Sequence, residues 1–367
     1  MVESEKRMVS LDVFRGITVA AMIFVNITAL TDAVPYFLHH AEWDGLYFGD
    51  LVFPFFIFIS GISMAFAFKK KVKSFKHQWS SFFSRVILLF ALGLFLNWIW
   101  DPTNFNVRVP GILQLIALSS LFAAPFAKNK PKWILLIATI LILIHSYILL
   151  YVEVPDFQPG MFDYYENIGG WIDMHVIGSM HMLNSNFDPE GILALFSSTA
   201  LLLLGLALGR TLQIKGGNNT TLLILFISGL LSCIIGFILS FKIPIIKQLW
   251  TSSFILILAG LGTLLFSILY YYLDIKRKKS ILLMISPLGR NALFIYILSM
   301  LVMSLTEGYI VFPCADGNSI SLYAYIFSYN IPFLSPMWEQ ILFGLLFVLF
   351  YTLIATILHY KKIYIKI

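Results

Sequence analysis

The sequence predicts an all-α polytopic membrane protein with about ten transmembrane helices and both termini in the cytoplasm. Its 367 residues are 59% hydrophobic and only 12% charged, and the mean hydropathy is +0.86. A chain of this length needs more than 25 Lys/Arg and 19 Asp/Glu to cover a soluble surface. Apolar stretches of membrane-spanning length recur, and basic residues gather in alternate loops. These observations exclude a soluble globular protein.

Ten apolar stretches, each bounded by charges, proline or glycine, can form a helix that crosses a bilayer, which takes about 20 residues. They cover residues 11–30, 51–68, 80–98, 110–127, 132–152, 190–209, 220–241, 249–272, 281–305 and 338–358. A further segment, 319–334, is aromatic and moderately apolar, but it is short and contains Pro332. We expect this segment to be interfacial or re-entrant rather than an eleventh span.

The distribution of Lys and Arg predicts the orientation of these spans. With a cytoplasmic N-terminus, the inner segments hold 19 of the 25 basic residues and the outer loops hold 3. Cytoplasmic loops of membrane proteins carry such an excess, and an error of one span would destroy it. The net charge of +6 therefore reflects membrane orientation rather than a nucleic-acid site. Neither Cys233 nor Cys314 has metal-ligand spacing, and we expect no metal site and no disulfide between them.

Acidic residues identify the outer loops as the place where a polar site can form. Fifteen of the 19 carboxylates lie outside, and seven of these belong to the loop 153–190. Together with loops 31–50 and 306–337, this is where the extramembrane chain is long enough to build a site. All three loops are predicted to be external.

The first outer loop contains a candidate proton acceptor, His40. A histidine side chain can take up a proton near neutral pH and return it later, and a neighbouring carboxylate fixes its tautomer. Glu42, Asp44 and Asp50 are close enough in sequence to do so, and His40 and Asp44 also form an HxxxD pattern. The alternative is an exposed interfacial loop whose Trp43 belongs to the aromatic belt. Spacing alone does not decide between the two interpretations.

Several polar residues lie within or at the ends of the apolar stretches. They are Arg15, Asn26, Gln114, His145, Lys247, Arg290 and Asn291. An ionisable group such as His145 within a span is a functional candidate, but a hydrogen bond between helices is the commoner explanation. For Asn26 and Gln114, the composition does not separate such a structural role from one in lining a substrate channel.

Six ordered blocks of sequence resemble one known family. They read SLDVFRGITVAAMIFVN (10–26), HHAEWDGLYFGDLVFPFFIFISG (39–61), GILQLIAL (111–118), FDPEGIL (187–193), KQLWTSSF (247–254) and PLGRNAL (287–293). On these blocks the chain resembles the transmembrane acetyltransferases related to heparan-α-glucosaminide N-acetyltransferase. We expect the bacterial form, which lacks a large luminal N-terminal domain, and a single transmembrane acyltransferase domain over residues 1–367.

The resemblance implies transfer of an acetyl group from cytosolic acetyl-CoA to an amino or hydroxyl group of a sugar on the external face. The active histidine of the family matches His40, which is expected to act either as general base or as a carrier of the acetyl group, and Asp44 or Asp50 is expected to orient it. The acceptor site is expected to include Asn26, Trp43, Gln114, Asp173, His181, Asp188 and Glu190. The phosphates of acetyl-CoA are expected near Arg15, Lys247, Arg290, Asn291 and the basic cluster 276–279. The expected location is the bacterial inner membrane, and the expected assembly is a homodimer.

Two departures from the family pattern concern possible substrate contacts. Ile246 stands where the family has a polar Asn, and Leu115 stands where many bacterial members have Arg. The acceptor of this chain is therefore left open. The rival interpretations are a transporter of sugars or envelope fragments without acyl transfer, and a non-catalytic membrane scaffold. A transporter explains the spans equally well but does not explain the histidine-bearing outer block.

Overall fold

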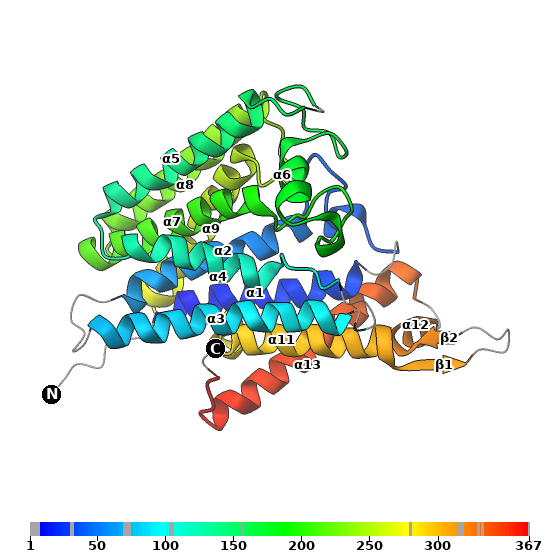
Figure 1. Cartoon of the computed structure of the whole chain (residues 1–367). Coiled ribbons are helices and arrows are strands. Elements are labelled where there is room, and N and C mark those ends of the chain that lie inside the picture. Colours follow the sequence, from blue (N-terminus) through cyan, green and yellow to red (C-terminus); the bar gives the residue numbers. More distant parts are fainter. Residues whose placement is uncertain are drawn as a thin grey trace.

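The computed structural model is an all-helical bundle with one short β-hairpin (Figure 1). It describes residues 8–29, 33–68, 75–100, 102, 106–155, 157–278, 281–313, 319–328, 331 and 334–365. Among the residues singled out above, Lys279, Cys314 and Pro332 lie outside the described part of the chain.

Nine helices in the described part are long and apolar enough to cross a membrane. They are α1 (Val9–Thr28), α2 (Phe48–Ala67), α3 (Phe75–Trp100), α5 (Pro131–Tyr151), α7 (Ile192–Lys215), α8 (Asn219–Ser240), α9 (Ser252–Tyr270), α11 (Ala292–Ser304) and α13 (Pro336–Tyr360). Single turns of π-helix extend α9 to Ile275 and α11 to Tyr309. The predicted span 110–127 is the shorter apolar helix α4 (Ile112–Ala123) with its extension to Phe126. The predicted fold class is thereby confirmed, whereas the orientation stays a prediction.

Helices α1, α2, α7 and α9 form the interior of the bundle, and α3, α5, α8 and α13 expose most of their apolar surface. Close helix contacts in membranes depend on small residues, because lipid offers apolar side chains as good a partner as another helix does. The contact of α2 with α7 follows this rule. A Cβ at Gly61 would lie 2.0 Å from the carbonyl oxygen of Leu202, and one at Gly205 would lie 2.1 Å from that of Phe58.

The predicted span 281–305 is broken rather than continuous. A short helix, α10 (Ser286–Arg290), precedes α11, and Asn291 between them has non-helical dihedral angles (φ −117°, ψ 29°). Helix α10 packs on α1 because Gly16 and Gly289 bring the backbones into contact. A Cβ at Gly289 would lie 1.7 Å from the carbonyl oxygen of Asp12. The hydropathy of the segment predicted the apolar length correctly but not this break.

Segment 319–334 contributes the strand β2 (Ser319–Ser321) and the seven-residue helix α12 (Leu322–Ser328) to the described structure. Strand β2 pairs antiparallel with β1 (Val311–Pro313). A helix of seven residues is too short to cross a bilayer, so α12 is not an eleventh span.

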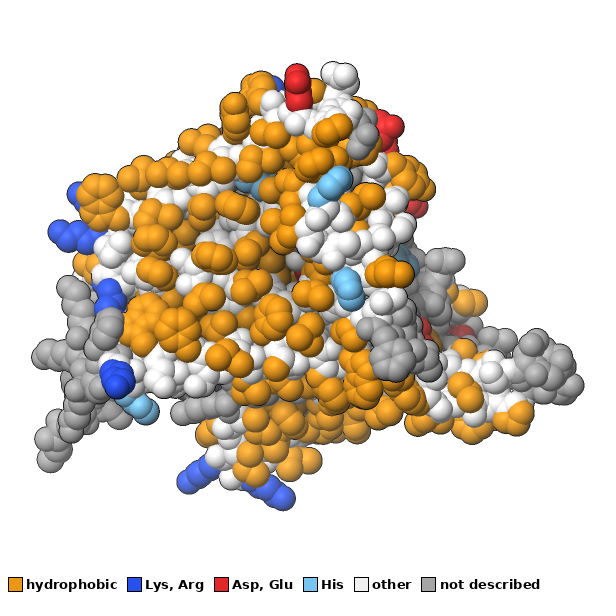
Figure 2. All heavy atoms as spheres, in the orientation of Figure 1, with side chains coloured by type: hydrophobic (Ala, Val, Ile, Leu, Met, Phe, Trp, Pro, Cys, Tyr) orange, Lys and Arg blue, Asp and Glu red, His pale blue; other side chains and the backbone are white. Residues whose placement is uncertain are grey.

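The loops 33–47 and 153–191 lie at the same end of the bundle as α6 (Ile168–Val176), on the right in Figure 1. Figure 2 shows the visible acidic side chains at this end and along the upper right, whereas most of the visible Lys and Arg lie at the left and lower ends. We call the end with α6 the loop end and the opposite one the basic end.

Candidate functional site

Three loops that are far apart in the sequence meet at the loop end. Asp44 accepts a hydrogen bond from the backbone N–H of Ile245 (3.1 Å), and Gly45 donates its backbone N–H to the Ile245 carbonyl (2.9 Å). These bonds join loop 33–47 to loop 241–251. Trp43 donates its indole N–H to the carbonyl of Phe162 (2.6 Å) and so joins the first loop to loop 153–191.

His40 and Asp50 form a hydrogen-bonded pair where loop 33–47 enters α2. The Nδ1 atom of His40 lies 2.9 Å from Oδ1 of Asp50. The other carboxylate oxygen of Asp50 accepts the backbone N–H groups of Ala41 and Tyr47, each at 3.0 Å. Asp50 is in the first turn of α2, where a carboxylate is favoured by the unpaired N–H groups of the helix. Two backbone N–H groups thus hold the carboxylate of Asp50 in place, and this carboxylate orients the imidazole of His40.

Asp50, and not Asp44, is the partner of His40. Of the two carboxylates expected to orient the imidazole, Asp44 instead bonds to the backbone of Ile245. The prediction of that role for Asp44 is therefore not supported by its contacts. The imidazole is 44% exposed while the Asp50 side chain is fully buried. In the described part of the chain no hydrogen bond engages Nε2 of His40, so this ring nitrogen is open to a substrate.

Lys247 is the third member of this cluster. Its Nζ lies 2.9 Å from Nδ1 of His40 and 3.3 Å from Oδ1 of Asp50. The side chain is 15% exposed. Burial lowers the pKa of Lys247, and the charges of Asp50 and Glu190 oppose that change. The Lys247 side chain therefore contacts both His40 and Asp50, and the charge of Glu190 acts on it as well.

Arg108 connects the acidic residues of loop 153–191. It makes a bidentate pair with Asp188, with Nε–Oδ2 and Nη2–Oδ1 distances of 2.8 and 2.7 Å, and it also contacts Glu190. The Asp188 side chain is fully buried and also accepts the backbone N–H groups of Leu183 and Glu190. Burial raises the pKa of Glu190, against the opposing charge of Arg108. The fully buried carboxylate of Asp188 would be destabilising without the charge of Arg108 beside it.

Asp173 and His181 organise the same loop. The carboxylate of Asp173 accepts the backbone N–H groups of Asp188 (3.2 Å) and Ile192 (2.8 Å), at the start of α7. Burial raises the pKa of Asp173 to about 6. His181 bonds through Nδ1 to the carbonyl of Val107, next to Arg108. Hydrogen bonds within the protein therefore occupy these groups, and they shape the site rather than line it with free polar atoms.

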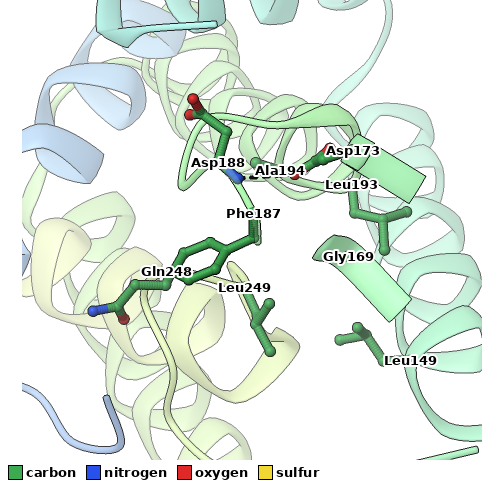
Figure 3. Close-up of a pocket in the computed structure, with 9 residues that line it drawn as sticks. All are labelled: Leu149, Gly169, Asp173, Phe187, Asp188, Leu193, Ala194, Gln248 and Leu249. Atoms are coloured by element: carbon green, nitrogen blue, oxygen red, sulfur yellow. Dashed lines mark hydrogen bonds between the residues drawn. The ribbon is translucent and has the colours of Figure 1, made fainter. Parts of the chain in front are cut away.

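A small pocket lies beside the Asp173–Asp188 contact (Figure 3). Its walls are mostly apolar, from Leu149, Phe187 and Leu249. Figure 3 shows the carboxylate of Asp188 directed away from Phe187 and Leu249. The space is of the size of a water molecule and does not accommodate a sugar or a thioester.

A second polar cluster lies at the basic end. Arg15 bonds to Asp12 (3.0 Å) and Ser63 (2.9 Å), and Nε of Arg290 lies 3.6 Å from the other oxygen of Asp12. Two guanidinium groups therefore lie around the Asp12 carboxylate. Asn291, expected with them, bonds to the backbone of Ile363 and Ile365 and so holds the C-terminal segment. Lys247, expected in the same group, lies at the opposite end of α9 and cannot share a phosphate with Arg290.

The remaining candidates lie inside the bundle. Asn26 in α1 is half-buried and contacts Sδ of Met300 at 3.5 Å. Gln114 in α4 is buried, and neither of its amide atoms has a hydrogen-bond partner in the described structure. The same holds for both ring nitrogens of His145 in α5. No group of three or more His, Cys, Asp or Glu that could hold a metal ion occurs among the described residues.

Comparison with known proteins identifies the family. The sequence model of the family described as "Heparan-alpha-glucosaminide N-acetyltransferase, catalytic" matches residues 7–238. The curated heparan-alpha-glucosaminide N-acetyltransferase of Homo sapiens is 27% identical over 357 residues, which cover 79% of this chain and 52% of that protein. The Mus musculus protein of the same name is 26% identical over 362 residues, covering 80% of this chain and 53% of its own length. The chain thus spans about half the length of the curated relatives it matches.

The matched residues 7–238 include His40, Asp50 and Arg108, whereas Lys247 and Arg290 lie beyond them. More than half of the 367-residue chain is matched. The predicted family is thereby confirmed: this multi-pass membrane protein belongs to the heparan-alpha-glucosaminide N-acetyltransferase catalytic family.

Proposed function

We propose that this chain is a transmembrane acetyltransferase that moves the acetyl group of cytosolic acetyl-CoA to an amino or hydroxyl group of a sugar on the external face. The observation that carries the proposal is the pair of His40 and Asp50, in which a buried carboxylate orients an exposed imidazole with an open Nε2. The family membership supports the reaction class. The proposed active domain extends over the whole chain, 1–367.

In the proposed reaction His40 is the general base. Its Nε2 accepts the proton of the acceptor amine or hydroxyl while that group attacks the carbonyl carbon of the thioester. The carbon–sulfur bond breaks, and the proton passes from Nε2 to the CoA thiolate. Asp50 keeps the imidazole in the tautomer that carries hydrogen on Nδ1, as the carboxylate of a Ser–His–Asp triad does. This route needs one proton acceptor and no acetyl-histidine intermediate.

The basic end is proposed to bind the phosphates of acetyl-CoA. Arg15 and Arg290 both lie against Asp12, and Nε of Arg290 has no hydrogen bond in the described structure. Guanidinium groups suit phosphate oxygens, to which they can donate two parallel hydrogen bonds. The helical rise from Arg15 to Thr28 is roughly 20 Å. The pantetheine arm must cover that separation between helices, and Gln114 and Asn26 are the polar groups proposed to line its path.

The acceptor site is proposed at the loop end, between Trp43, Glu190 and His40. The Glu190 side chain is 10% exposed and lies beside Arg108 and Lys247. Asp173, His181 and Asp188 are proposed to hold the loop that forms this site, because their polar atoms bond to the protein itself. A loop rich in carboxylates attracts a cationic amino sugar. The proposed setting is the bacterial inner membrane, and the proposed assembly is a homodimer.

The proposal is tested with purified protein, radiolabelled acetyl-CoA and a panel of amino sugars and glycans. Wild type is expected to label a sugar, and His40→Ala is expected to lose this activity. His39→Ala is the matched control, because the His39 imidazole contacts the carbonyl of Val34 and not the cluster. Consumption of acetyl-CoA without a labelled sugar would reject the proposed acceptor class. Absence of acetyl-CoA binding in folded wild type would reject the enzyme and favour the transporter.

A further inference from the structure

In the cluster at the loop end, Nδ1 of His40 faces both a hydrogen-bond acceptor, Asp50, and a hydrogen-bond donor, Lys247. Nδ1 lies 2.9 Å from both Oδ1 of Asp50 and Nζ of Lys247. A neutral imidazole nitrogen is either a donor or an acceptor. Nδ1 therefore cannot donate to Asp50 and accept from Lys247 at the same time.

The hydrogen-bonding capacity of Asp50 resolves this conflict. If Lys247 donates to Nδ1, the lone pairs of Nδ1 and Oδ1 face each other at 2.9 Å, which is repulsive. If Nδ1 donates to Oδ1, the same oxygen can also accept from Lys247 at 3.3 Å, because a carboxylate oxygen has two acceptor sites. The second arrangement lets Asp50 accept from both groups and leaves two donors, the N–H of Nδ1 and the ammonium of Lys247, 2.9 Å apart. It places hydrogen on Nδ1 and leaves the lone pair of Nε2 free.

We propose that Lys247 is a positioning residue of the acetyl transfer, which keeps Asp50 ionised beside the imidazole and makes the imidazolium of His40 release its proton. This inference rests on the proposed function of His40 as the base. It assigns to Lys247 a role at the loop end in place of the phosphate contact that the sequence suggested.

The physical reason lies in the second half of the reaction. A carboxylate at 2.9 Å stabilises the imidazolium that forms when Nε2 takes the acceptor proton. A base that holds its proton too firmly does not return it to the leaving thiolate. The ammonium of Lys247, 2.9 Å from the ring, opposes the positive charge on the imidazolium. The two neighbours together let His40 both accept and return a proton.

The charged groups around His40 are few in the described structure. Asp50 faces it from α2 and Lys247 faces it from loop 241–251. Glu190, from the loop before α7, acts on Lys247 rather than on the imidazole. In its own loop, His39 contacts the carbonyl of Val34 and Asp44 contacts Ile245. Lys247 is therefore the cation whose removal changes the field at the ring most directly.

The test compares the pH dependence of kcat in wild type, Lys247→Met and Lys247→Arg. Removal of the charge stabilises the imidazolium, so the acidic limb of the Lys247→Met profile is expected to move to higher pH by about one unit. At neutral pH we expect kcat to fall about tenfold while KM for acetyl-CoA changes less than twofold. Lys247→Arg keeps the charge and is expected to keep the wild-type profile. Lys242→Met, at an exposed lysine of the same loop, is the matched control.

A second measurement does not depend on activity. Diethyl pyrocarbonate modifies unprotonated imidazole, and mass spectrometry of the His40 peptide reports the extent of reaction against pH. The midpoint is expected to move to higher pH in Lys247→Met, by the same amount as the kinetic limb. If this variant does not fold, Lys247→Gln replaces it with the same expectation, because glutamine can donate to Asp50 without a charge.

Two results would overturn the inference. An unchanged pH midpoint with a lower kcat would make Lys247 a merely structural residue. A raised KM for acetyl-CoA with an unchanged kcat would show that Lys247 binds acetyl-CoA instead. Absence of any acetyl transfer by wild type would instead reject the proposed function, and the modification experiment would still report on the field at His40.

Discussion

Nδ1 of His40 lies 2.9 Å from Oδ1 of Asp50, and the two side chains differ sharply in exposure. The carboxylate is fully buried in the first turn of α2, whereas the imidazole is 44% exposed at the mouth of the loops. Backbone N–H groups of Ala41 and Tyr47 hold the carboxylate in place. The rigid end of a membrane helix therefore fixes the orientation of an accessible base.

Asp50→Asn is expected to lower kcat by about 10⁴-fold with little change in stability, as the equivalent exchange does in a Ser–His–Asp triad. The amide presents its N–H₂ to Nδ1, which then becomes an acceptor, and the ring hydrogen moves to Nε2. Steady-state kinetics of acetyl transfer measure the effect. Asp44→Asn is the matched control, since its oxygen still accepts the N–H of Ile245. Equal losses in the two variants would contradict the assignment of Asp50.

Gly49→Ala is expected to impair activity by moving the imidazole. A Cβ at Gly49 would lie 2.8 Å from Nδ1 of His40 and 2.7 Å from the carbonyl oxygen of His39, which is too close. We expect a loss of kcat of about tenfold or more, because a small misplacement of a catalytic group is costly. Gly308→Ala is the control, since a Cβ there meets no atom within 4 Å. An active Gly49→Ala would show that the ring position is not critical.

Arg108→Met is expected to destabilise the folded protein, because it leaves the fully buried carboxylate of Asp188 without its partner. Loss of one partner from a buried pair costs about 3–5 kcal/mol. Asp188→Asn is expected to act in the same direction. In the double variant the loss is expected to be clearly smaller than the sum, since both changes remove the same pair. Thermal unfolding in detergent measures this, and additive losses would argue against a direct pair.

The contribution of Asp173 to stability is expected to depend on pH. Burial raises its pKa from 3.8 to about 6, so the folded protein keeps a proton that the unfolded chain has lost. The stability that Asp173 contributes is therefore fully present below about pH 4 and is lost as the pH rises through 6, a change on the order of 2–3 kcal/mol. The Tm difference between wild type and Asp173→Asn, followed from pH 4 to 7.5, is expected to shrink with rising pH.

Glu166→Gln, at an exposed carboxylate of the same loop, is the control for the Asp173 experiment. A Tm difference that grows in favour of wild type above pH 6 would have the opposite sign and would contradict a raised pKa for Asp173.

The sequence predicted the position of nine helices of spanning length in the described part, because span length and flanking charges are local properties, whereas the tenth predicted span is the shorter helix α4. It did not predict the break before α11, where Gly289 and Gly16 let two backbones touch. That contact depends on which helices become neighbours, and hydropathy contains no such information. Likewise, the sequence offered Asp44 and Asp50 equally as partners of His40. In the structure the two differ, because Asp50 in the first turn of α2 contacts the imidazole, whereas Asp44 bonds to the backbone of Ile245 in loop 241–251.

Arg108 and Lys247 show a different limit of sequence analysis. Arg108 is one of the three basic residues in the predicted outer loops, and its pairing with Asp188 joins positions 80 residues apart. A useful signal existed, since a lone arginine in an acidic outer region is a candidate for pairing. Lys247 was grouped with Arg290 as a basic residue at a span end, but α9 separates the two. The charge of a residue does not reveal at which end of a long helix its partner lies.

The most direct test of the central claim uses sealed proteoliposomes with glucosamine enclosed and labelled acetyl-CoA outside. Wild type that faces acetyl-CoA with its basic end is expected to accumulate labelled N-acetyl sugar inside the vesicles. His40→Ala in the same orientation is expected to accumulate none. Labelled luminal sugar from His40→Ala at the wild-type rate would contradict the assigned base. Transfer by wild type only to sugar on the same side as acetyl-CoA would contradict transfer across the membrane.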